Sequence, residues 1–66
     1  MIYELKIKFE LNPIPKYIKF KSELDLQELL KKINEIKGWI NVTNIKNELY
    51  NFYLPEIKYY RIKAVK

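Results

Sequence analysis

Residues 22–38, SELDLQELLKKINEIKG, carry the clearest structural signal in the chain. Leucine and isoleucine recur every three or four positions, which places them on one face of an amphipathic helix. Ser22 is expected to cap the amino end, with Asp25 reaching back to it, and Gly38 to end the helix in a left-handed conformation. The pattern predicts a helix over residues 23–37. Its buried stripe consists of Leu26, Leu29, Leu30, Ile33 and Ile36.

Two β-strands are predicted before this helix. Residues 2–11 predict a half-buried strand, because apolar and charged side chains alternate strictly from Tyr3 onward. Pro13 and Pro15 interrupt the alternation, because proline has no N–H to give to a sheet. Residues 16–21 then resume the period of two. The two segments together predict an antiparallel hairpin.

The register of this hairpin affects how its charges meet. Pairing Phe9 with Ile18 sets Lys8 directly opposite Lys19, and like charges in that position are unfavourable. A slip of two residues instead pairs Glu10 with Lys19. Both registers leave lysines clustered on the face that points away from the core.

The pattern after the helix is weaker. Residues 39–45 are rich in β-branched and aromatic side chains, and residues 46–48 can turn the chain into a second arm, 49–54. Apolar positions within 45–54 also fit helical spacing, so a short helix is the alternative to the favoured strand. Residues 57–65 alternate again and predict a last strand.

These elements predict an α+β fold with one domain, residues 1–66. Because a single helix covers only one face of a sheet, we expect two layers. One is an antiparallel sheet of four or five strands and the other is the helix, in the order ββαβ(β)β. The chain has 66 residues and neither Cys nor His, so packing rather than a disulfide or a zinc ion must stabilise it.

The uncovered face of the sheet is expected to be positively charged. The chain has 13 Lys and Arg against 8 Asp and Glu, a formal net charge of +5, which favours anionic partners. Projecting the alternation places eight basic and aromatic residues on this face: Lys6, Lys8, Tyr17, Lys19, Lys21, Tyr59, Arg61 and Lys63. Trp39, Asn41, Thr43, Asn51 and Tyr53 from the less certain middle of the chain are expected beside them.

Cations interleaved with tyrosines are typical of single-stranded nucleic-acid binding, where Lys and Arg contact phosphates and aromatic rings stack on bases. We therefore expect Tyr17 and Tyr59 to stack and the basic residues to contact phosphates. The ordinary alternative is a solvated sheet face whose lysines protect edge strands from aggregation.

A second interpretation is a protein interaction module. Trp39 and Tyr53 would then contact a protein partner or a second copy of the chain, as in a small accessory protein of a phage or other mobile element. Since Trp39 directly follows Gly38, burial at the end of the core is favoured over an exposed position.

Residue types argue against an enzyme. The chain has no His and no Cys, its one Ser and one Gly are assigned to helix ends, and its carboxylates are scattered. We expect no catalytic residues, no cofactor, no metal and no small-molecule substrate. No stretch resembles a signal peptide or a membrane span, so we expect a cytoplasmic protein without a membrane partner.

Overall fold

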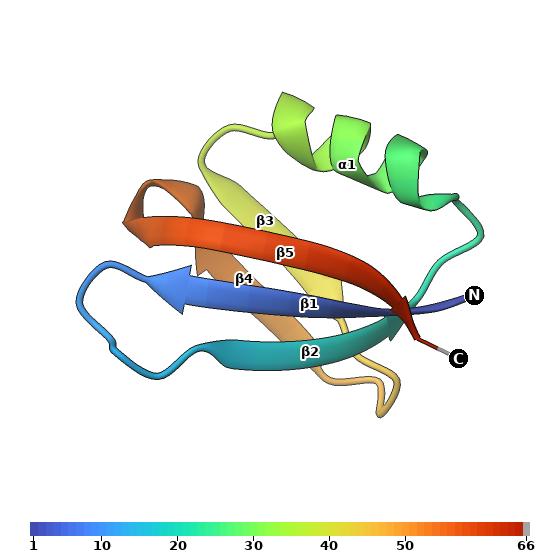
Figure 1. The fold of residues 1–66 in the computed structure, drawn as a ribbon, viewed down its shortest axis with the longest axis horizontal. Coiled ribbons are helices and arrows are strands. Elements are labelled where there is room, and N and C mark those ends of the chain that lie inside the picture. The colour runs from blue at the N-terminus through green and yellow to red at the C-terminus, as the bar shows by residue number, and fades with distance from the viewer. Residues whose placement is uncertain (66) are drawn as a thin grey trace.

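The computed structural model describes residues 1–65, which form five β-strands, one α-helix and one short 3-10 helix (Figure 1). In chain order these elements are β1 (Ile2–Phe9), β2 (Lys16–Lys21), α1 (Leu26–Glu35), β3 (Trp39–Thr43), β4 (Leu49–Tyr53), η1 (Leu54–Glu56) and β5 (Ile57–Val65). The predicted α+β class and element order are confirmed. The strand preferred over a helix in the middle of the chain is confirmed as well.

The strands form two antiparallel sheets rather than the single sheet that was predicted. β1 lies between β2 and β5, whereas β3 and β4 pair only with each other. Figure 1 shows the β3–β4 hairpin behind the three-stranded sheet, with its strands crossing β1 and β2, and α1 along the β5 side. A helix of 10 residues is about 15 Å long, too short to cover strands that reach about 27 Å, so the hairpin completes the second layer.

The core lies between these layers and is centred on β1. Tyr3, Leu5 and Ile7 are almost completely buried, and they meet Leu29 of α1 and Phe52 of the hairpin in one apolar cluster. The alternation predicted for the first strand therefore sorts its side chains as expected. The hydroxyl of Tyr3 donates to the carbonyl oxygen of Leu24 at 2.6 Å, so this buried polar group is satisfied.

The first strand is shorter than predicted. β1 ends at Phe9 with an irregular register, and Leu11 is 98% exposed instead of facing the core. The Asn12 side chain accepts a hydrogen bond from the N–H of Ile14 at 3.0 Å, which forms a turn before Pro15. The chain has left the sheet by this point, so Leu11 lies in the loop.

The β1–β2 register differs from both predicted registers. Leu5 faces Ile18, which brings Glu4 opposite Lys19 and Lys6 opposite Tyr17. The long proline-containing loop between β1 and β2 permits this register, in which charges of opposite sign face each other. Lysine pairs across these two strands are thereby avoided.

The helix begins later than predicted and uses another cap. Asp25 is the N-cap residue, and its carboxylate accepts from the N–H of Glu28 at 2.8 Å. Ser22 instead accepts from the N–H of Leu24 at 3.1 Å in the preceding turn. At the other end, Ile36 lies outside the helix and Gly38 adopts the expected positive φ of 88°.

Candidate nucleic-acid interface

The face of the three-stranded sheet that points away from the core brings together all eight residues predicted for it. Odd-numbered residues of β1 are buried, so its even-numbered residues point outward together with their cross-strand neighbours on β2 and β5. We call this surface the open face. Its predicted members are Lys6, Lys8, Tyr17, Lys19, Lys21, Tyr59, Arg61 and Lys63.

Lys6 lies at the centre of the open face. It is opposite Tyr17 on one side and Arg61 on the other. Its ammonium nitrogen is 5.9 Å from the centroid of the Tyr17 ring and 5.8 Å from that of Tyr59, within cation–π range. Tyr17 is 54% exposed and Tyr59 45% exposed, so both rings present area to solvent.

Glu4 is the acidic residue of the open face. It faces Lys19 on β2 and Lys63 on β5, and the Lys63 ammonium is 3.7 Å from its carboxylate. Surface pairs of this kind contribute at most about 1 kcal/mol. Lys63 is therefore free to exchange this carboxylate for a phosphate. At the loop end of the face, the ammonium group of Lys8 donates to the carbonyl oxygen of Asn12.

The positive charge of the chain is unevenly distributed. The open face holds six cations and one carboxylate, a formal charge of +5, which equals that of the whole chain. The sequence contains seven further lysines and seven further acidic residues, and these balance one another. The face consequently accounts for the excess of positive charge.

The residues predicted from the middle of the chain lie elsewhere. They occupy the outer face of the β3–β4 hairpin, in the other layer. Trp39 is directly opposite Tyr53, with ring centroids 5.0 Å apart. The expected burial of Trp39 is wrong, because this side chain is 59% exposed. Its neighbour Ile40 faces the core instead. The rest of this outer surface consists of Asn41, Thr43, Leu49 and Asn51.

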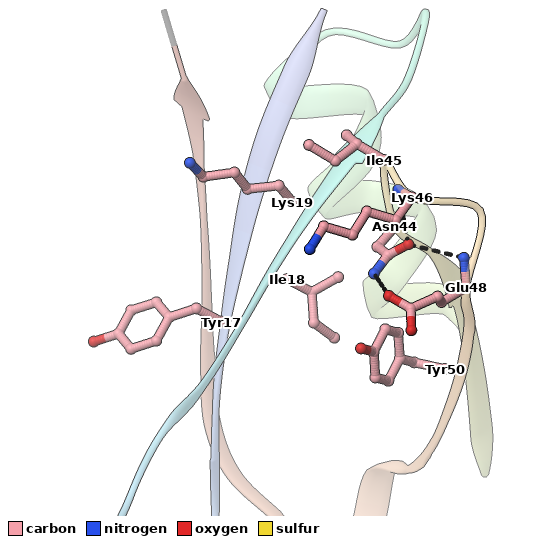
Figure 2. A pocket seen from close by; sticks show the side chains of 8 residues that line it. All are labelled: Tyr17, Ile18, Lys19, Asn44, Ile45, Lys46, Glu48 and Tyr50. Atoms are coloured by element: carbon pink, nitrogen blue, oxygen red, sulfur yellow. Dashed lines mark hydrogen bonds between the residues drawn. The ribbon is translucent and has the colours of Figure 1, made fainter.

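Sequence reasoning missed a pocket at the outer edge of β2. Figure 2 shows its side chains, with Tyr17 pointing away from Asn44, Lys46, Glu48 and Tyr50. The only sequence signal was the turn at residues 46–48, which does not reveal that the turn contacts β2. Within residues 1–65, no three Asp or Glu side chains come together as candidate metal ligands.

Comparisons with protein-family models, curated proteins and solved structures gave no match to this chain. Among residues 1–65, no helix has both the length and the apolar character needed to cross a membrane.

Proposed function

We propose that this chain binds single-stranded nucleic acid through the open face. The observation that carries the proposal is that six cations and two exposed tyrosines share one sheet face with a single carboxylate. Neutralising phosphates releases counterions, which is the main source of affinity for a polyanion. The tyrosines add stacking, which contributes about 1–3 kcal/mol per base in such sites.

The arrangement of the rings favours unpaired bases. Tyr17 and Tyr59 stand on the two outer strands, with Lys6 of β1 between them. A nucleic-acid strand that crosses the sheet can stack its bases on both rings while its phosphates contact the cations. The Lys6 ammonium then moves from the rings to a phosphate. Stacked bases of a duplex cannot reach such rings, so we expect single strands to be preferred.

A salt titration of a fluorescent single-stranded oligonucleotide tests this proposal. Contact with about four phosphates should give a slope near −3 for log K against log salt, at roughly −0.7 per contact. The double variant Lys6→Gln and Arg61→Gln should lose about two contacts and flatten the slope by about 1.4. The matched control is Lys31→Gln with Lys32→Gln, which makes the same charge change on exposed positions of α1.

The control variant should keep the slope of the original chain. Absence of binding at low salt would refute the proposal. Equal flattening in both double variants would show that binding follows the net charge and does not use the open face.

A second candidate function is self-association through the β3–β4 hairpin. Its two strands, WINVT and LYNFY, contain no charged residue. On their outer surface the exposed Trp39 and Tyr53 rings form a pair, and such residues are enriched at protein interfaces. A second copy could cover this surface without bringing two basic open faces together.

Molar mass in solution tests the second candidate. A dimer should have twice the 8.1 kDa mass of the chain and should shield Trp39, the one tryptophan, from a soluble fluorescence quencher. Trp39→Ser should restore the monomer, while Tyr17→Ser on the open face should leave the dimer intact. A monomeric mass at all concentrations, with Trp39 fully quenched, would refute self-association.

A further inference from the structure

The pocket beside β2 is built where the two sheets touch. It has a volume of about 230 Å³, and its walls come from β2, the β3–β4 turn and β4 (Figure 2). The backbone N–H of Ile45 in the turn donates to the carbonyl oxygen of Lys19 in β2 at 2.9 Å. This bond fixes the turn against the edge of the three-stranded sheet, next to the open face.

Hydrogen bonds within the turn hold a carboxylate at the pocket wall. The side-chain oxygen of Asn44 accepts from the N–H of Lys46 at 3.0 Å and from that of Glu48 at 2.8 Å. Its amide nitrogen donates to one carboxylate oxygen of Glu48 at 2.9 Å. Among residues 1–65, no cation lies within ion-pair distance of Glu48. Its second oxygen is therefore available to accept from a ligand.

The remaining walls suit a flat ring attached to a phosphate. Ile18 is buried and gives an apolar wall, and the half-buried Tyr50 gives an aromatic one. The ammonium group of Lys16 lies 4.7 Å from the centroid of the Tyr50 ring, and Lys46 lines the same pocket. The pocket thus combines apolar and aromatic walls, the Glu48 carboxylate as acceptor and three nearby cations, Lys16, Lys19 and Lys46.

We infer that this pocket binds one unpaired base carrying an exocyclic amino group, within a strand held on the open face. The inference rests on the function proposed above. A carboxylate only accepts hydrogen bonds, so Glu48 can accept from the exocyclic amino group of cytosine, adenine or guanine, whereas the O4 carbonyl of thymine or uracil offers it no donor. The volume is below the 300–1,000 Å³ typical of drug-sized ligands and is suited to a single ring system.

Lys19 connects the two sites. Its side chain belongs to the open face, while the residue also lines the pocket from the outer edge of β2. A single-stranded nucleic acid that lies across the sheet can pass over this edge. One of its phosphates would then contact Lys19, and the next base would enter the pocket. Binding on the open face, which does not depend on the base sequence, would then be combined with a preference for certain bases at one position of the nucleic acid.

The test compares an oligothymidylate of about nine nucleotides with the same strand containing one central cytidine. The original chain should bind the cytidine strand about tenfold more tightly, as expected for one good base contact. Glu48→Gln can keep the bond from Asn44 through its amide oxygen while presenting an NH₂ donor to the pocket. This variant should lose or reverse the cytidine preference.

Glu35→Gln is the matched control, because it makes the same charge change at the exposed carboxyl end of α1. This control variant should keep the cytidine preference. In the protein without substitutions, the side-chain amide NMR signal of Asn44 should shift when the cytidine strand is added. Equal affinity for both strands, or an unchanged preference in Glu48→Gln, would overturn the pocket and leave open-face binding standing. Failure of both strands to bind would overturn the proposed function and the pocket with it.

Discussion

The six tyrosines of this chain have different surroundings, which strand parity and element position decide. Tyr3 has an odd position in β1 and is completely buried, with its ring stacked on Phe20 at a centroid distance of 5.7 Å. Tyr59 and Tyr60 are adjacent in β5, yet Tyr59 joins the open face and Tyr60 turns inward, where its hydroxyl donates to Asn34 at 2.6 Å. Parity can be recognised in the sequence, so the open face could be predicted residue by residue.

Replacing both Tyr17 and Tyr59 with alanine should weaken binding of a single-stranded oligonucleotide. The expected loss is about 1–3 kcal/mol for each stacked base, with little change in the free energy of unfolding because both rings are exposed. Tyr3→Ala should instead destabilise the fold by about 3–5 kcal/mol through loss of a large core side chain. Urea unfolding and oligonucleotide titration measure the two effects. If the double variant unfolds instead, these rings contribute to the core.

At the scale of elements, local patterns were readable and long-range ones were not. The helical spacing of Leu26, Leu29 and Ile33 depends only on neighbouring residues, so the existence of α1 was predictable. The N-cap residue is the one whose side-chain oxygen reaches a free N–H of the first turn. Ser22 and Asp25 are both of a favoured N-cap type, so the sequence does not decide between them. The structure assigns the cap to Asp25, three residues beyond the predicted position.

Asp25→Ala should therefore lower the free energy of unfolding by about 1 kcal/mol, because the N–H of Glu28 loses its acceptor. Ser22→Ala should have a smaller effect, since its hydroxyl stabilises only the turn before the helix. Thermal and urea unfolding of both variants provide the comparison. A larger loss for Ser22→Ala would mean that the helix begins where the sequence first indicated.

For the whole molecule, the arrangement of the two sheets could not be predicted from the sequence. The hydrogen bond between Ile45 and Lys19 joins residues far apart in the chain, and no local pattern encodes it. That contact creates the pocket, and the separate hairpin leaves Trp39 exposed. These features of the candidate sites arise from how the layers pack, whereas the open face arises from alternation within single strands.

The charge imbalance of the open face also gives the molecule a permanent electric dipole. Under the proposed function, the field of a polyanion would exert a torque on this dipole and would favour encounters in which the open face meets the nucleic acid first. In the proposed complex, with the cations on the phosphates, the uncharged surface with Trp39 and Tyr53 would face outward, since it belongs to the other layer. Molecules gathered along one strand would then display identical aromatic surfaces to their surroundings.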